Sequence, residues 1–242
     1  MNRIFSILPI IPHLLSLTQL CSSIMELVFK GSGDSRLLAL TIDDFPSSGL
    51  GDTDTGSRAL LDLLKDLKIP ATFFCIGKNV SDHPGMVTRA VNEGHELGNH
   101  MARDQWSVLL TKEQFIDQLQ FTAIKIMHEL ESSSTPITPL KWFRPSGGWP
   151  TPQMLVWAET LGYRTVLGSI WPFDGLSIPL LSKKVRTKLQ EEFIQRFAHP
   201  GGIIVMHDTD QFNPLTRETL KVVVPQLKAE GYTFVRLSEL LE

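Results

Sequence analysis

The chain has 242 residues, 42% of them hydrophobic and 20% charged, so it can bury one full core but hardly two. Its formal net charge of -3 at pH 7 provides no general electrostatic affinity for nucleic acid, which depends on clustered Lys and Arg. With only 2 cysteines the chain has neither a disulfide framework nor a cysteine-rich zinc site, and Cys75 lies in an apolar run that predicts a buried thiol.

At the N-terminus, residues 1–24 are apolar, with one arginine near the start and no acidic residue. This pattern resembles a secretory signal peptide, which has a basic start and a hydrophobic middle. Pro9, Pro12 and His13 interrupt the apolar stretch, which therefore does not predict a membrane-spanning helix. We expect a cleaved signal peptide and hence a secreted or cell-surface protein. The alternatives are a retained anchor, or an ordinary N-terminal arm on a cytoplasmic protein.

From residue 37 onward, short β-branched or aromatic runs alternate with longer segments whose apolar residues recur at helical spacing, the pattern of repeated β–α units. Strands are predicted at 37–42, 71–76, 95–99, 142–144, 164–167, 202–206 and 233–236. Helices are predicted at 57–68, 84–92, 112–131, 152–161, 181–197 and 216–230. The sequence therefore predicts an α/β fold with seven strands in a single domain.

Several residues mark the ends of the predicted helices. Thr111 and Gln114 have the spacing of a capping box, and Thr151 precedes a proline in the first turn of its helix. A left-handed residue is commonly needed after a helix, and glycine occupies that position three times, at Gly94, Gly162 and Gly231.

Two adjacent carboxylates, Asp43 and Asp44, directly follow the first predicted strand. In barrels of parallel strands, reactive side chains gather where strands end. Neighbouring ionised carboxylates repel each other and are costly to desolvate unless a cation binds one or a proton neutralises the other. The alternative is a solvated turn, favoured by Pro46 and Gly49.

His100 follows the third predicted strand. If a helical turn begins there, Asp104 lies four residues on and on the same face, as paired metal ligands on a helix must. Surface helices produce this spacing by chance as well. His95, in the same segment, falls outside this scheme and is interpreted as a structural histidine.

Arg144 ends the fourth predicted strand and precedes a tight turn that contains two glycines. Arginine keeps its charge and can hold a carboxylate through two parallel hydrogen bonds, so it can orient a catalytic Asp and keep it ionised. A surface arginine beside a turn is the alternative. His207 ends the apolar sixth strand, where a histidine could protonate a leaving amine because it titrates near neutrality.

Four segments together, Thr41–Asp44, Gly98–His100, Arg144–Pro145 and Ile203–Asp208, resemble in order and spacing the motifs of the polysaccharide deacetylase family, also called the NodB-homology domain or carbohydrate esterase family 4. The resemblance runs from residue 36 to residue 242. It implies one catalytic domain folded as a distorted (β/α)7 barrel, in agreement with the number of strands predicted independently.

The resemblance also implies chemical roles. Asp43 would be the general base and His207 the acid that protonates the departing sugar nitrogen. Asp44 and His100 would bind one divalent metal, usually zinc. The family has a histidine as third ligand where this chain has Asp104, and a carboxylate is acceptable to zinc and better suited to harder metals. Asp104 therefore stays the expected third ligand, with cobalt or manganese as alternatives to zinc.

Arg144 would hold the base in position, and other residues would contact the substrate. By similarity to the family, the Gly147 backbone N–H would help to hold the oxyanion, while Trp149 and Val205 would shape the pocket for the acetyl methyl group. Aromatic faces suit pyranose rings, so Trp149 and Trp171 are candidates for stacking on sugars. Packing in the core is the alternative for both tryptophans.

An acidic family motif after the fifth strand is matched poorly by the segment Gly168–Asp174. Asp174 could take its place as a partner of His207 or of Arg144. This departure and the altered metal ligand set bear directly on whether the chain is active.

The function implied is metal-dependent removal of N-acetyl groups from an amino-sugar polymer or oligosaccharide, chitin-like or from a cell wall, through a tetrahedral intermediate. The metal would bind the acetyl carbonyl and a water whose pKa it lowers. The partner predicted is this glycan; neither nucleic acid nor a protein partner is predicted. Two alternatives stay open, a C–N hydrolase of another small or lipid-linked amide on the same scaffold, and a non-catalytic carbohydrate-binding derivative.

Overall fold

The computed structural model describes residues 27–31, 35–47, 56–131, 139–175 and 181–242. The predicted signal peptide at 1–24, with Cys21, and the turn residue Gly49 lie outside these residues. Every helix within them is too short or too polar to span a lipid bilayer.

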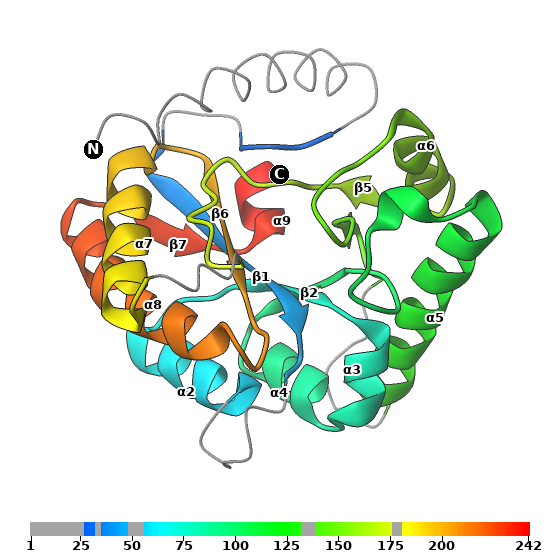
Figure 1. Ribbon diagram of the computed structural model, residues 1–242, viewed down its shortest axis with the longest axis horizontal. Coiled ribbons are helices and arrows are strands. Elements are labelled where there is room, and N and C mark those ends of the chain that lie inside the picture. Colours follow the sequence, from blue (N-terminus) through cyan, green and yellow to red (C-terminus); the bar gives the residue numbers. More distant parts are fainter. Residues whose placement is uncertain (1–26, 32–34, 48–55, 132–138, 176–180) are drawn as a thin grey trace.

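Parallel strands form a single sheet at the centre of the molecule (Figure 1). Its order is β5-β4-β3-β2-β1-β6, and β7 also pairs with β1. The strands are β1 (Leu37–Phe45), β2 (Thr72–Cys75), β3 (Glu96–Asn99), β4 (Trp142–Phe143), β5 (Arg164–Thr165), β6 (Gly202–His207) and β7 (Thr233–Val235). All seven correspond to predicted strands, and because they run in parallel, their carboxyl ends meet at one edge of the sheet.

The sheet curls until the chain after β5 reaches β6, which completes the distorted barrel that was predicted. Ile170 forms a bridge with Ile204 in β6, and Val28 forms one with Val166 just after β5. Gly168 lies so close to β6 that an added Cβ would be 2.1 Å from the Val205 Cγ2 atom. The barrel therefore closes through irregular backbone rather than through a ladder between β5 and β6.

We expect Gly168→Ala to lower the free energy of unfolding by about 1–3 kcal/mol, because the extra methyl group overpacks the closing segment. Urea unfolding measures this change. Val205→Ala provides the control, since it removes the clashing methyl group: Gly168→Ala should cost less in that background than in the wild type. If the double variant lost the sum of the free energies of unfolding that the two single variants lose, the clash between Gly168→Ala and Val205 would not govern stability.

The helices lie around the outside of the sheet, except the C-terminal one, whose residues pack in the interior of the barrel (Figure 1). They are α2 (Ser57–Leu67), α3 (Gly77–Asp82), α4 (Met86–Asn92), α5 (Lys112–Leu130), α6 (Pro152–Thr160), α7 (Lys183–Phe197), α8 (Asn213–Ala229) and α9 (Leu237–Leu241), with a 3-10 turn η2 (Ser107–Leu109). The six predicted helices are all present. The sequence did not predict α3, α9 and η2, because they have 6, 5 and 3 residues and are too short to show helical periodicity.

The predicted helix ends are confirmed. Thr111 and Gln114 form a capping box, and the Thr151 side chain accepts a hydrogen bond from the Met154 backbone N–H. All three predicted glycines have positive φ, 89° at Gly94, 83° at Gly162 and 88° at Gly231. Cys75 is a free, buried thiol, as expected.

Successive side chains of a strand point to opposite faces of the sheet, so the strands divide the core into an outer and an inner layer. Leu38, Leu40 and Ile42 of β1 pack in the outer layer with residues of α2 and α8. Ala39 packs in the inner layer with β4, β6 and α9 residues, at the end of the barrel opposite the strand ends discussed above. His95 proves structural: its Nδ1 accepts from the Ala71 N–H at 3.0 Å, and burial lowers its pKa to about 4.

Candidate active site

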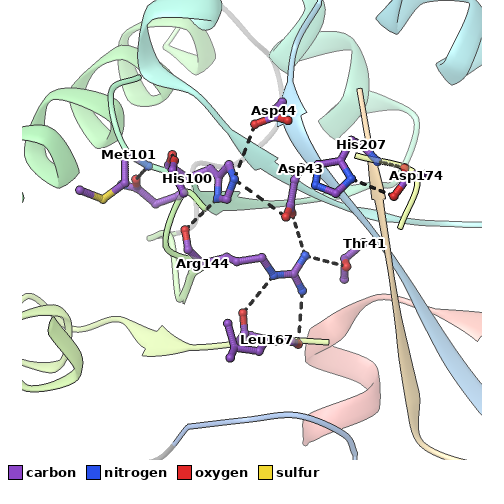
Figure 2. Close-up of polar contacts among 12 residues, drawn as sticks. Thr41, Asp43, Asp44, His100, Met101, Arg144, Leu167, Asp174 and His207 are labelled. Atoms are coloured by element: carbon purple, nitrogen blue, oxygen red, sulfur yellow. Dashed lines mark hydrogen bonds and ion pairs between the residues drawn. The ribbon is translucent and has the colours of Figure 1, made fainter. Parts of the chain in front are cut away.

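The polar residues predicted to be functional continue the inward-facing rows of the strands. Thr41 and Asp43 follow Ala39 along β1 at the two-residue period of a strand, and His207 stands in the same relation to Ile203 on β6. Asp43 and His207 are register partners in adjacent parallel strands. The two-residue period of the strands therefore places both side chains at the same end of the barrel, and Figure 2 shows them close together.

Arg144 holds Asp43 in a buried ion pair. Its Nη1 donates to Asp43 Oδ1 at 2.7 Å and to Thr41 Oγ1 at 2.9 Å, and its Nε donates to the Val166 carbonyl at 3.0 Å. The guanidinium also lies 4.2 Å from the centroid of the Phe74 ring. These contacts fix the guanidinium from several sides, so the carboxylate it binds has a fixed orientation.

The charges around Asp43 keep it ionised. Burial raises the pKa of this carboxyl group, but Arg144, His100 and His207 together lower it below its ordinary value. An ionised carboxylate with a fixed orientation can accept a proton, as the predicted role of Asp43 as general base requires.

Asp44 and His100 form the second close pair of the site. His100 Nδ1 is 2.8 Å from the Arg144 carbonyl oxygen, which can only accept, so Nδ1 carries a proton and Nε2 is the nitrogen that would bind a cation once it is unprotonated. Nε2 faces Asp44 Oδ1 at 3.6 Å. Asp44 adopts a left-handed backbone conformation, with φ 66°, and is 7% exposed. Sparsely populated conformations of this kind cluster at functional sites.

A divalent cation fits between these two side chains. Atoms 3.6 Å apart can both bind one ion at about 2.0–2.2 Å, and the pair comprises an imidazole nitrogen and a carboxylate oxygen. Burial raises the pKa of Asp44 to about 6; the histidines His100 and His207 oppose the shift, and Asp104 and Asp43 add to it. A cation would supply the positive charge that this buried carboxylate lacks.

Asp104 is not brought into this pair. Residues 102–105 form bends, so the helical turn predicted from His100 is wrong. The physical reason is Met101, whose φ of 72° lies outside the helical region. Asp104 is exposed, although its charge is near enough to raise the pKa of Asp44. No group of three or more His, Cys, Asp or Glu side chains in the described residues is arranged to hold a metal ion.

His207 is paired with Asp174, one of the two partners considered for that carboxylate. Its Nδ1 is 2.9 Å from Asp174 Oδ1, and its backbone N–H donates to Asp174 Oδ2 at 2.7 Å. Burial lowers the pKa of His207, but Asp174 and then Asp43 and Asp44 raise it to about 10. The imidazolium is therefore the stable form near neutral pH, and it can donate a proton.

We expect Asp174→Asn to lower the pKa of His207, because it removes the nearest negative charge. The alkaline limb of the pH–rate profile should move down by roughly 1–3 pH units. The raised pKa of His207 stabilises the fold fully below its unfolded value of 6.5, and this contribution disappears as pH rises through about 10. The variant should therefore be less stable than the wild type in acid, with the difference vanishing in alkali. An unshifted alkaline limb would contradict the pairing.

Asp208 is a buried residue to which the sequence analysis gave no role. Its side chain accepts hydrogen bonds from Ser47 Oγ at 3.0 Å, from Ser57 Oγ and from Asn213 Nδ2, and its N–H donates to the Asp43 carbonyl. Burial raises its pKa to about 7 against these hydrogen bonds. Asp208 thus ties the ends of β1 and β6 to the first turns of α2 and α8. Its place after His207 was the only signal in the sequence.

The predicted substrate residues are found in different settings. Gly147 has φ 82° in the turn that follows Arg144. Val205 is 7% exposed in the inward row below His207, whereas Trp149 and Trp171 are 52% and 41% exposed, which excludes plain core packing for both. The sequence analysis missed Trp106, which is 61% exposed and lies 3.6 Å from where a Gly147 Cβ would be.

Comparisons with known proteins agree with the fold and with the family that the sequence resembles. The family model for polysaccharide deacetylase matches residues 30–166. A peptidoglycan-N-acetylglucosamine deacetylase of Bacillus cereus is 30% identical over 212 residues, covering 86% of this chain and 89% of that protein. A crystal structure of a peptidoglycan N-acetylglucosamine deacetylase in complex with a substituted benzamide superposes with a TM-score of 0.77 at 25% identity, over 90% of this chain and 94% of the other.

The same fold also occurs without activity. A pseudoenzyme of carbohydrate esterase family 4 from Bacillus anthracis superposes with a TM-score of 0.73 at 24% identity, over 89% of this chain and 69% of the other. Likeness of fold therefore does not separate an active chain from an inactive one. The side chains at the mouth of the barrel must do so.

Proposed function

The chain belongs to the polysaccharide deacetylase family, hydrolases of non-peptide C–N bonds, and we propose that it removes N-acetyl groups from the amino sugars of a glycan with Asp43 as base and His207 as acid. The single observation that carries the proposal is the pairing of each group with its own partner. Arg144 keeps Asp43 ionised, and Asp174 keeps His207 protonated. Two titratable groups whose pKa values are driven apart in this way have the properties of a base and an acid.

The base acts at the start of the reaction. Asp43 takes a proton from water as the water attacks the acetyl carbonyl, and Arg144 keeps the carboxylate aimed while it does so. Asp43 Oδ2 faces His100 Nε2 at 3.9 Å, so the base borders the proposed cation position. A divalent cation held by Asp44 and His100 would supply Lewis-acid chemistry, polarising a carbonyl oxygen and lowering the pKa of water.

The acid acts when the C–N bond breaks. His207 lies on the strand next to Asp43, at a backbone separation of about 4.8 Å, and donates its proton to the sugar nitrogen. The products are acetate and a glycan with a free amine. Asp174 holds the imidazole through Nδ1, which leaves Nε2 as the donor.

A purely carbohydrate-binding role is disfavoured by the buried charges. Arg144 and Asp43 are 2% and 4% exposed, and burying an ion pair often gives no net gain in stability. Binding a neutral sugar needs neither this pair nor the His207–Asp174 pair. Proton transfer during hydrolysis accounts for both pairs.

The substrate we propose is a polymer or oligosaccharide of N-acetylated amino sugars, from a cell wall or chitin-like. Trp106, Trp149 and Trp171 offer exposed aromatic faces for pyranose rings. The Bacillus cereus relative is named for activity on peptidoglycan, which supports a cell-wall glycan. Such a substrate agrees with secretion or surface attachment, as expected from residues 1–24.

Acetate release from cell-wall glycan, chitooligosaccharides and acetylated xylan tests the proposal, with metal-stripped protein to which zinc, cobalt or manganese is restored. We expect release from the amino-sugar substrates, and acetylated xylan, whose acetyl groups are esters, shows whether the site hydrolyses esters as well as amides. No release with any metal, from protein that still binds glycans, would favour the non-catalytic alternative. Activity confined to small amides would favour the other hydrolase.

A further inference from the structure

One face of α7 and the chain before it form an apolar surface, here called the α7 patch. It is made of the exposed Phe173, Val185, Leu189 and Phe197 and the half-buried Leu181 and Phe193. The exposed fractions are 37% for Phe173, 44% for Val185, 51% for Leu189 and 48% for Phe197. Scattered exposed apolar residues are normal on soluble proteins, but contiguous apolar patches commonly mark interaction sites.

Ring contacts, a shared cavity and helical spacing together join the residues of the α7 patch. The ring centroids of Phe173 and Phe193 are 5.5 Å apart, and those of Phe193 and Phe197 are 4.5 Å apart. Phe173, Leu181, Leu189 and Phe193 also line one cavity of about 220 Å³. On α7 itself the patch residues recur every four positions, which places them along one stripe of the helix.

Phe173 is held outward by its backbone. Its φ is 58°, a conformation that a bulky residue rarely adopts. The next residue, Asp174, is buried against His207. The chain thus turns sharply between a residue that belongs to the active site and one that belongs to the surface.

The charge around the α7 patch is positive. α7 contains 5 Lys or Arg and 2 Glu, a net charge of +3. Glu191 is 8% exposed and pairs with Lys188 at 3.4 Å, so Glu192 is the only acidic side chain that α7 exposes. The whole chain carries -3, which leaves -6 on the remainder (-3 less +3). An anionic surface would therefore attract α7 and repel the rest of the molecule.

We propose that the α7 patch docks on the surface of an anionic lipid bilayer. A helix with an apolar stripe and a Lys- and Arg-rich flank lies in the membrane interface, with its apolar side chains below the headgroups. A glycan suits this surface less well, because the exposed aliphatic side chains of Val185 and Leu189 cannot stack on sugar rings. Docking would hold Asp174, and with it the mouth of the active site, beside the membrane.

Flotation of the full chain with vesicles tests this proposal. Vesicles containing phosphatidylglycerol should bind the protein at least about tenfold more tightly than vesicles of phosphatidylcholine alone. Binding should weaken as salt is raised, because salt screens the attraction. Absence of binding to phosphatidylglycerol vesicles, or equal binding to both kinds, would overturn the proposal.

Two double variants separate the contribution of charged residues to vesicle binding from that of apolar residues. Lys183→Glu with Lys184→Glu should lower binding at least about tenfold, without harm to the fold since acidic residues favour the first turn of a helix. Leu189→Ser with Phe197→Ser should lower it by a similar factor. None of these residues contacts the catalytic pairs, so deacetylation of a soluble oligosaccharide should stay unchanged.

Matched controls place the same changes elsewhere. Lys112→Glu with Lys221→Glu, and Ile124→Ser with Met127→Ser on α5, where the two residues are 63% and 47% exposed, should leave binding unchanged. Controls that weaken binding as much as the patch variants would contradict docking through α7. So would a wild-type dimer in sedimentation that Leu189→Ser with Phe197→Ser converts to a monomer, since the patch would then bind a second copy.

Discussion

Asp43→Asn is expected to lower the rate of acetate release by about 10²–10⁴-fold, the range that a general base contributes. The asparagine keeps an oxygen that accepts from Arg144 but cannot take a proton from water. KM should change little, since Asp43 is buried and its role is in the chemical step. Steady-state acetate release on a glycan fragment measures both parameters.

Folding must be measured alongside, because the substitution leaves Arg144 buried without its anionic partner. The pKa of Asp43 is lowered in the folded protein, so its charge stabilises the fold above the unfolded value of 3.8, and this contribution is lost as pH falls below that value. The variant should be less stable than the wild type at neutral pH, and its free energy of unfolding should fall less on acidification. Asp66→Asn, on the exposed side of α2, is the matched control and should change neither rate nor stability. A rate within about tenfold of wild type would exclude Asp43 as the base.

Much of the barrel could be predicted because each strand carries its own signal. Side chains two residues apart in a strand point to the same face, so Ala39, Thr41 and Asp43 of β1 share one face. Because Ala39 points into the barrel, Asp43 at the end of the strand also points inward. The same logic places His207 at the mouth. Local sequence was sufficient here because the strand period is regular and the strands are parallel.

Prediction failed where the backbone departs from regular conformations or where partners are distant in sequence. Met101, two residues after the end of β3, has a left-handed backbone conformation that breaks the expected turn, and a methionine in the sequence does not indicate such a conformation. Asp208 contacts Ser57 across 151 residues, a pairing that only the folded chain reveals. Asp174 was hard to assign because the surrounding motif is weak, yet its contact with His207 is direct. The apolar spacing of α7 is visible in the sequence, but exposure of that stripe is a property of the fold.

Removing divalent cations is expected to lower acetate release at least about a hundredfold, because a Lewis acid contributes several kcal/mol to the stabilisation of developing charge. Restoring one metal at a time then identifies the preferred ion. Asp44 and His100 provide one carboxylate and one imidazole, and the third ligand decides which metal is bound most tightly.

Asp104→His tests that third position directly. If Asp104 moves from its exposed place to complete the ligand set when metal binds, histidine there should raise zinc affinity about tenfold or more and reduce the preference for harder ions. Asp104→Ala should then weaken binding of every metal, whereas Asp117→Ala, an exposed carboxylate on α5, should not. Calorimetric titration of the metal-free protein measures affinity without reference to activity. Unchanged affinity in Asp104→Ala would mean that Asp44 and His100 hold the ion with water or substrate oxygen, and that Asp104 acts on Asp44 only through its charge, as it does in raising the pKa of that carboxyl group.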